Sequence, residues 1–249
     1  MPSLIAANLK QRHAVADSEF DALLGPAARE RSKSYWSVVR AAQLAADLFR
    51  EAGAERVLDV GSGVGKAAAI LSLDLGRRVW GVEQRPHLVL ESRKLAQALG
   101  AEVVVLEGGL EQINPHRFDG FYCFNPFAEN VADPPDCFDL TTERSFDRYL
   151  RDARRVESWL REAPLGTALV TLNGLGGRVP VSFTVRRALD VNGDTLRLWV
   201  KDKVVSSDEA WIELEGNLVL ASRIAALAEK ANGFFSDTSL VRALALPGR

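Results

Sequence analysis

The segment VLDVGSGVG, residues 57–65, decides how the rest of this chain is interpreted. A short apolar run carries Asp59 near its end and then breaks into glycines at alternate positions, Gly61, Gly63 and Gly65. Residues 66–71 follow with a helical pattern. Glycine suits a turn where the backbone approaches a ligand closely, because a Cβ would collide with the ligand or exclude the required φ values. The segment therefore predicts a strand, a tight turn and a helix, with a binding site made largely of main chain.

A second apolar strand over residues 78–83 ends in a carboxylate, Glu83, which is followed by Gln84. An acid at such a strand end can accept two hydrogen bonds from a ribose diol. A dinucleotide site would need the spacing G-x-G-x-x-G, and its third glycine position is Lys66 here. The two strand ends together therefore predict a nucleoside cofactor and disfavour an NAD-dependent oxidoreductase.

The apolar pattern predicts alternating strands and helices along most of the chain. Helices are expected over residues 32–53, 86–100 and 141–162, and further strands over 102–106, 118–124 and 167–172. Residues 183–189 and 195–200 alternate around Asn192 and Gly193, which predicts a terminal hairpin. We expect an α/β core over residues 54–202, a helical N-terminal cover over 1–53 and a C-terminal appendage over 203–249. In the appendage the pattern fits either a helix over 217–231, which we favour, or a hairpin of 211–215 with 218–220.

Written as D-x-G-x-G-x-G, the glycine segment resembles motif I of the class I S-adenosylmethionine (SAM) dependent methyltransferases. The resemblance implies a Rossmann-like seven-stranded sheet with helices on both faces and an antiparallel last strand, and it implies SAM as cofactor. By the same resemblance, SAM is held by residues from the turn, from the second strand end and from an N-terminal segment. These residues are Asp59, Gly61, Ser62, Gly63, Gly65, Glu83, Gln84, Tyr35 and Trp36. Tyr35 and Trp36 equally fit a role as aromatic residues packed on the core.

The end of the third strand differs from the family pattern at the position that contacts adenine. Many relatives have Gly-Asp there, whereas this chain has Gly108 and Gly109, between Glu107 and Leu110. Either Glu107 takes over the contact with the adenine amino group, or the backbone makes it.

The fourth strand ends in Asn125, Pro126 and Phe127, followed by Ala128. This stretch resembles the [DNS]-P-P-[YF] motif of amino-group methyltransferases, with Phe127 in place of the second proline. It also resembles the Asn-Asn-Phe-Ala stretch of histone lysine methyltransferases that lack a SET domain, whose D-x-G-S-G-V-G and G-V-E motifs are matched too. The resemblance covers about residues 35–130.

Chemistry explains why such a motif suits nitrogen. The amide oxygen of Asn125 and a carbonyl near Pro126 can accept the hydrogens of an amine and so aim its lone pair, while Phe127 can stack beside a flat or cationic group. We therefore expect a methyltransferase that acts on a nitrogen of a protein or small-molecule amine. The alternatives are an RNA or other small-molecule methyltransferase and a non-catalytic SAM-binding subunit.

Charge and composition limit the other classes of function. The 249 residues carry a net charge of −2, which gives no global attraction to nucleic acid or acidic membranes. Five acids between Asn125 and Glu143, with no lysine or arginine among them, would favour a cationic substrate if that loop lines the site, although solvated loop charge explains them as well. They are Glu129, Asp133, Asp136, Asp139 and Glu143. The two cysteines, Cys123 and Cys137, form no metal-ligand spacing, so we expect no metal and a cytoplasmic protein with reduced thiols.

Overall fold

The computed structural model describes residues 2–132, 137–139 and 141–205, and the backbone of residues 211–214. The α-helices are α1 (Pro2–Lys10), α2 (Asp17–Asp21), α3 (Pro26–Glu30), α4 (Ser32–Tyr35), α5 (Val39–Ala52), α6 (Lys66–Leu75), α7 (Pro86–Leu99) and α8 (Phe146–Glu162). Short 3-10 turns are η1 (Leu110–Gln112), η2 (Pro115–Arg117) and η3 (Ala128–Val131). The strands are β1 (Val57–Val60), β2 (Val79–Glu83), β3 (Val103–Glu107), β4 (Gly120–Phe124), β5 (Ala168–Leu172), β6 (Arg178–Pro180), β7 (Phe183–Val191), β8 (Asp194–Lys201) and β9 (Trp211–Leu214).

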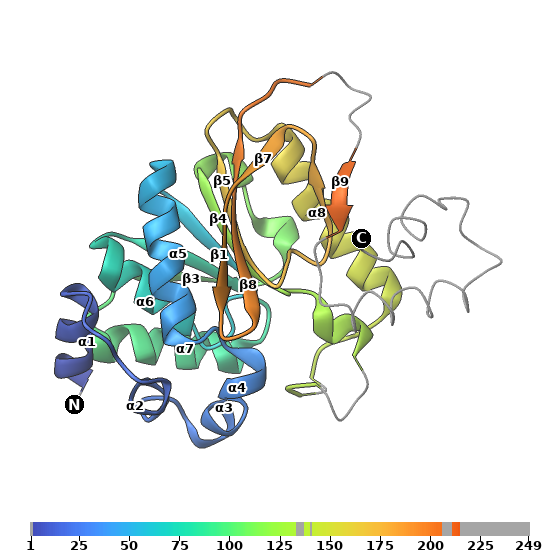
Figure 1. Cartoon of the computed structure of the whole chain (residues 1–249). Helices are drawn as coiled ribbons and strands as arrows, with labels where there is room; N and C mark the ends of the chain where they lie inside the picture. The colour runs from blue at the N-terminus through green and yellow to red at the C-terminus, as the bar shows by residue number, and fades with distance from the viewer. Residues whose placement is uncertain (1, 133–136, 140, 206–210, 215–249) are drawn as a thin grey trace.

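Seven of these strands form one sheet in the order β3-β2-β1-β4-β5-β8-β7 (Figure 1). The first five are parallel, and β8 enters between β5 and β7 antiparallel to both. The terminal hairpin and the antiparallel last strand of the sheet are thus confirmed. Because β1, β2 and β4 are parallel neighbours, their carboxyl ends lie along one edge of the sheet, where open α/β sheets bind ligands.

Side chains alternate between two apolar layers along each central strand, as the two-residue period of a strand requires. On β4, Tyr122 joins the core beneath α5 and α6, while Phe121 and Cys123 join the core beneath α8. Figure 1 shows α5, α6 and α7 on one side of the sheet and α8 on the other. Each face of the sheet is therefore buried in its own apolar core.

The N-terminal cover is tied to the start of α6 by a buried cation. Lys66 is almost fully buried and its Nζ lies 2.7 Å from carboxylate oxygens of both Asp17 and Asp21 on α2. Asp17 Oδ1 also accepts the Val39 N–H at 2.8 Å, so it caps α5. Helix α2 is therefore fixed to the start of both α5 and α6.

The helix expected over residues 32–53 is broken near its start. It ends at Gly53 as predicted, but α5 begins at Val39, and Trp36 and Val38 are extended. The indole N–H of Trp36 donates to the Ala28 carbonyl at 2.9 Å, a tertiary contact that a continuous helix would not allow. Tertiary contact here outweighs helical periodicity.

One further expectation needs correction, and the expectations for the appendage fall partly outside the described residues. Helix α8 begins at Phe146, not near residue 141, because the Ser145 side chain accepts the Arg148 N–H at 3.1 Å and caps it. In the appendage, β9 pairs with β6 in a small antiparallel sheet. Residues 218–220, the hairpin partner that the sequence offered for 211–215, lie outside the described residues. Strand β6 was not expected, and the helix predicted over 217–231 lies outside the described residues. No helix in the described part of the chain combines the length and apolar character needed to cross a bilayer.

Candidate functional site

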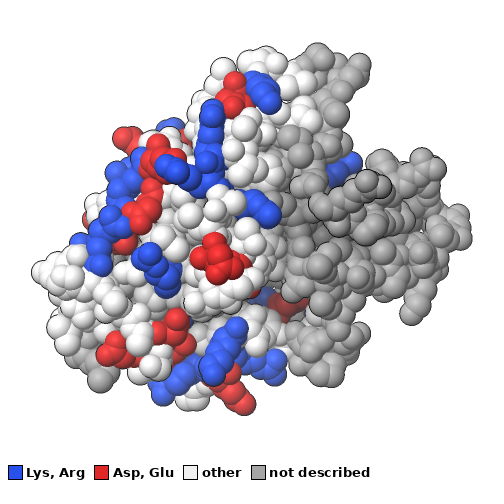
Figure 2. Space-filling model, in the orientation of Figure 1, with Lys and Arg blue, Asp and Glu red and all other residues white. Residues whose placement is uncertain are grey.

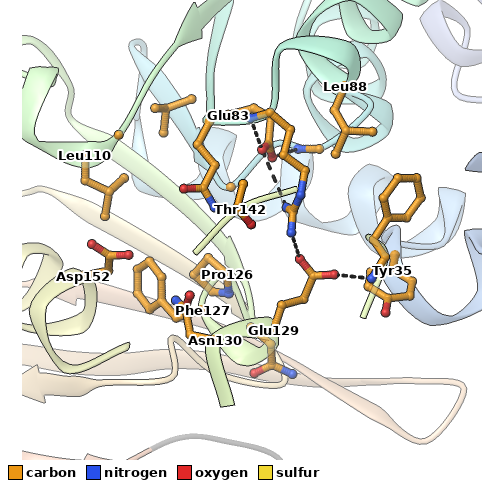
Figure 3. A pocket seen from close by; sticks show the side chains of 18 of the residues that line it. Tyr35, Glu83, Leu88, Leu110, Pro126, Phe127, Glu129, Asn130, Thr142 and Asp152 are labelled. Atoms are coloured by element: carbon orange, nitrogen blue, oxygen red, sulfur yellow. Dashed lines mark hydrogen bonds and ion pairs between the residues drawn. The ribbon is translucent and has the colours of Figure 1, made fainter. Parts of the chain in front are cut away.

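A crevice of about 900 Å³, measured with its open mouth, lies at the carboxyl ends of β1, β2 and β4. Twelve of the residues singled out from the sequence line it. They are Tyr35, Trp36, Gly61, Gly63, Glu83, Gln84, Gly108, Gly109, Leu110, Asn125, Pro126 and Phe127. Figure 3 shows part of this lining, with Tyr35 and Glu129 at one end and Leu110 and Asp152 at the other. The structure thus brings the predicted strand ends to one place.

The glycine turn forms the floor of the crevice. The N–H groups of Gly61 and Ser62 both donate to the Val82 carbonyl, at 3.1 and 3.0 Å, which holds the turn against β2. A Cβ added to Gly61 would lie 3.1 Å from the Cβ of Pro126, so the motifs that follow β1 and β4 touch. At Gly63, where φ is +53°, a Cβ would overlap the Trp36 ring. The turn needs glycine at these two places because other groups lie directly against its backbone.

Glu83 is buried at the end of β2, and both of its carboxylate oxygens accept backbone hydrogen bonds. Oε2 accepts from the Gly63 N–H at 3.1 Å and Oε1 from the Arg85 N–H at 2.8 Å. Burial raises the pKa of this carboxyl against the opposing effect of these hydrogen bonds and of Arg85. A carboxylate has about four acceptor positions, so Glu83 can still accept from the hydroxyl groups of a ligand.

Arg85, which was not singled out from the sequence, ties the acidic loop to the crevice. The buried guanidinium pairs with Glu129, lies 3.3 Å from an oxygen of Asp139 and lies 3.8 Å from Glu83. Glu129 also accepts the Phe138 N–H at 2.6 Å. Two of the five acids expected to attract a cation therefore neutralise Arg85 instead. Asp133 and Asp136 lie outside the described residues.

Phe138, carried by the same loop, packs among aromatic residues of the N-terminal cover. Its ring centroid lies 5.7 Å from that of Tyr35 and 5.4 Å from that of Trp36. Arg31 of the cover donates to the Cys137 carbonyl at 2.8 Å. The cover and the loop after β4 thus meet across one end of the crevice, and Tyr35 and Trp36 line that end.

Asn125 ends β4 in a conformation that few residues adopt, with φ at +41°. Its N–H donates to the Gly174 carbonyl at 3.2 Å, and its carbonyl accepts the Ala128 N–H at 3.1 Å. Its side-chain Oδ1 is buried and has no hydrogen-bond partner among the described residues. Since a buried acceptor without a partner is costly, this oxygen is suited to a donor that arrives with a ligand.

Four of the predicted residues do not line the crevice itself: Asp59, Ser62, Gly65 and Glu107. Asp59 and Ser62 line a smaller cavity, together with Ser37 and Tyr122, that shares Gly61 and Trp36 with the crevice. Burial, with a contribution from Glu83, raises the pKa of Asp59 to about 7, and its Oδ2 has no partner among the described residues. Gly65 begins α6.

Glu107 at the end of β3 is exposed, 3.8 Å from an Arg93 nitrogen.

Two side chains of α8, Arg148 and Asp152, enter the crevice from the opposite layer. Arg148 donates a hydrogen bond to the Gln84 side chain and lies 3.5 Å from Asp152. In the sequence, Arg148 and Asp152 appeared only as members of a helix that carries both positive and negative charges. Arg85 alone carried a local signal, since it stands two residues after the strand-end acid.

The comparisons with known proteins agree with this geometry. A family model described as protein-L-isoaspartate(D-aspartate) O-methyltransferase matches residues 30–129, which include the glycine turn and the ends of β2, β3 and β4. The chain is a class I methyltransferase. No curated protein sequence matches this methyltransferase significantly.

Two solved structures share the fold of this methyltransferase. A putative O-methyltransferase from Klebsiella pneumoniae is 18% identical with a TM-score of 0.52, over 81% of this chain and 97% of that one. An O-methyltransferase from Bacillus cereus, solved with S-adenosylhomocysteine, is 15% identical with a TM-score of 0.51, over 80% and 98%. At these identities the likeness establishes the fold.

The residues of the methyltransferase crevice fit SAM, the cofactor of this superfamily. Gly61 and Gly63 bring backbone to the floor of the crevice, and Glu83 offers carboxylate oxygens that can accept further hydrogen bonds. Within the described residues, no cluster of His, Cys, Asp and Glu has the arrangement of a metal site. The arrangement can hold a nucleoside and present its reactive end to a second molecule beside β4.

Proposed function

We propose that this methyltransferase transfers a methyl group to a nitrogen of a protein or small-molecule amine. The observation that carries the proposal is the unpartnered, buried Oδ1 of Asn125 in the lining of the crevice. An amine has hydrogens to donate to such an oxygen, and donating them fixes the direction in which its lone pair points. A hydroxylate or carboxylate acceptor has no hydrogen to offer.

SAM, when bound, supplies an electrophilic methyl group whose bond to sulfur breaks as the new bond to the acceptor forms, leaving S-adenosylhomocysteine. The chain therefore has to orient the acceptor and exclude water, and needs no strong base once the amine is neutral. Asn125 would orient the nitrogen, and the neighbouring Pro126 and Phe127 would form the wall beside it. Phe127 is almost completely buried, so its ring is held in place by packing.

Because Asn125 has a positive φ, the choice of substitution decides whether a variant also strains the backbone. Asn125→Gly keeps access to a positive φ and removes only the amide, whereas Asn125→Ala adds backbone strain. We expect Asn125→Gly to lower kcat/KM for an amine by roughly 10²-fold or more, the usual loss for one well-placed donor or acceptor. The dissociation constant for S-adenosylhomocysteine should change little. Unchanged methylation of the amine would remove the orienting role of Asn125.

The family model gives a specific reason to consider a carboxylate oxygen as the acceptor, because its description names isoaspartate methylation. The variant Asn125→Asp distinguishes methylation of an amine nitrogen from methylation of a carboxylate oxygen. Asp keeps an acceptor oxygen for an amine but repels a carboxylate and offers it no N–H. We expect Asn125→Asp to keep far more activity than Asn125→Gly on an amine, and to lose activity on a carboxylate.

The acceptor class itself can be measured with labelled SAM and three peptides that share one sequence. One carries a single lysine, one carries isoaspartate at that position, and the control carries alanine. Methylamines survive mild alkali, whereas methyl esters release methanol. Alkali-stable label on the lysine peptide supports the proposal, and label that leaves the isoaspartate peptide as methanol contradicts it.

A further inference from the structure

Residues of η1 and α8 line one end of the crevice. Acids near this end are candidates for recognising the adenine base of the cofactor. Gly109, which follows β3, has no side chain at the position where many relatives carry an acid, and the carboxylate of Glu111 lies directly against it. Three acids lie near this end: Glu107, Glu111 and Asp152. Figure 3 shows Asp152 beside Leu110 and Phe127, at the end of the crevice away from Tyr35.

Two of these acids face other surroundings. Glu107 is exposed beside Arg93 and does not line the crevice. Glu111 folds back on the turn, since a Cβ on Gly109 would overlap its carboxylate, and it does not line the crevice either. Asp152 is the one of the three that lines it.

The carboxylate of Asp152 is paired with Arg148, one turn earlier on α8. Its side chain is only 17% exposed, and its Oδ2 lies 3.5 Å from Nε of Arg148. Arg148 in turn donates a hydrogen bond to the side chain of Gln84, the residue after Glu83. Burial raises the pKa of Asp152, while Arg148 and Arg151 oppose that rise. An ionised carboxylate with one ion pair still has acceptor positions for a further donor.

Leu110, which follows Gly109, also lines the crevice and brings a backbone N–H to this end of it. The hydrogen bonds within η1 run from Gln112 N–H to the Gly109 carbonyl and from Ile113 N–H to the Leu110 carbonyl. The N–H of Leu110 is therefore not used by the turn itself, as is usual for the first residues of a helix. Adenine presents the matching pair, a donor at its 6-amino group and an acceptor at N1, whereas hypoxanthine presents the reverse.

We propose that Asp152 of α8 accepts the hydrogen bond from the 6-amino group of the SAM adenine, beside the Leu110 N–H, in place of the acid that Gly109 lacks. The proposal concerns this chain's selectivity for adenine and does not depend on which atom is methylated.

Calorimetric titration of the purified protein with S-adenosylhomocysteine and with S-inosylhomocysteine tests it without any acceptor or turnover. We expect the wild type to bind the adenine compound at least tenfold more tightly. Asp152→Ala should lower that ratio about tenfold or more, the usual loss for a hydrogen bond to a charged group. Asp152→Asn, which keeps the shape of the side chain, should also lower the ratio, because its amide can donate to the 6-oxo group.

Glu107→Ala and Glu111→Ala are the matched controls and should leave the ratio unchanged. An Arg148→Met variant removes the ion pair and keeps the carboxylate, so it should remain selective for adenine. An unchanged ratio in both Asp152 variants would overturn the proposal, as would loss of selectivity in either control. If Arg148→Met lowers this ratio as much as Asp152→Ala does, Asp152 affects adenine binding only through Arg148. That result would overturn the direct contact. Failure of the wild type to bind S-adenosylhomocysteine would overturn the cofactor assignment as well.

Discussion

The carboxylate of Glu83 accepts the Gly63 N–H at 3.1 Å, which joins the end of β2 to the glycine turn after β1. The two residues are the two strongest signals in the sequence, and the structure shows that they are in direct contact. The bond fixes the turn while leaving acceptor positions on the carboxylate. A single buried side chain thus both holds the glycine turn and lines the crevice.

Replacing Glu83 should weaken the cofactor complex. We expect Glu83→Ala to cost roughly 1.5 to 3 kcal/mol of binding free energy for S-adenosylhomocysteine, typical of a lost charged hydrogen bond. Glu83→Gln keeps the shape and part of the acceptor capacity, so it should lose less. Calorimetric titration measures both, and equal affinity in all three proteins would exclude a cofactor contact for Glu83.

The contact between Gly63 and Trp36 predicts a steric effect on stability. Gly63→Ala adds a Cβ at positive φ that overlaps the Trp36 ring, and we expect it to lower the free energy of unfolding by about 2 to 4 kcal/mol. Gly53→Ala is the matched control, since Gly53 also has positive φ but a Cβ there meets nothing within 4 Å. Gly53→Ala should lower the free energy of unfolding only through backbone strain, by about 1 kcal/mol.

Adding Trp36→Ala separates the overlap from the strain. In that background Gly63→Ala should cost no more than Gly53→Ala does, because the ring that it strikes is gone. Urea denaturation of the four variants gives the comparison. An additive result, with Gly63→Ala equally harmful with and without Trp36, would show that the ring does not lie over the turn.

Burial of Asp59 predicts a pH dependence of stability in the protein without cofactor. Its pKa is raised from 3.8 to about 7, so between these values the unfolded chain ionises while the folded chain keeps its proton. The stability that Asp59 contributes is therefore present below about pH 4 and is lost as the pH rises toward 7. Relative to the wild type, Asp59→Asn should gain up to about 4 kcal/mol across this window.

Denaturation curves of the two proteins at pH 4, 5, 6 and 7 measure this difference directly, because contributions from other carboxyl groups cancel between them. A difference in unfolding free energy that stays constant over the window would mean that Asp59 is ionised in the folded protein.

The ion-pair network of Arg85 predicts a large loss on substitution. Arg85→Met leaves the buried Glu83 and the partly buried Glu129 and Asp139 without their cation, and we expect it to lower the free energy of unfolding by about 3 to 5 kcal/mol. Arg187→Met is the control, because Arg187 and its partner Glu51 are both exposed and should contribute about 0 to 1 kcal/mol. Similar losses in the two variants, measured by urea denaturation, would contradict a buried network.

The sequence by itself determined the order of the strands that form the seven-stranded sheet, the glycine turn and the strand-end positions of Glu83 and Asn125. These are local properties, because apolar periodicity and glycine spacing act within a few residues of one another. The terminal hairpin was also visible, since Asn192 and Gly193 specify a turn without help from the rest of the fold.

Only the tertiary structure decided which residues from distant segments share the crevice. Arg85 meets Glu129 and Asp139 because a loop folds back over β2, and Asp152 enters because α8 covers the opposite face of the sheet. The break at Trp36 has the same origin, as its ring packs on the glycine turn rather than continuing a helix. Such contacts depend on packing and charge pairing between segments far apart in the chain, for which no local pattern exists.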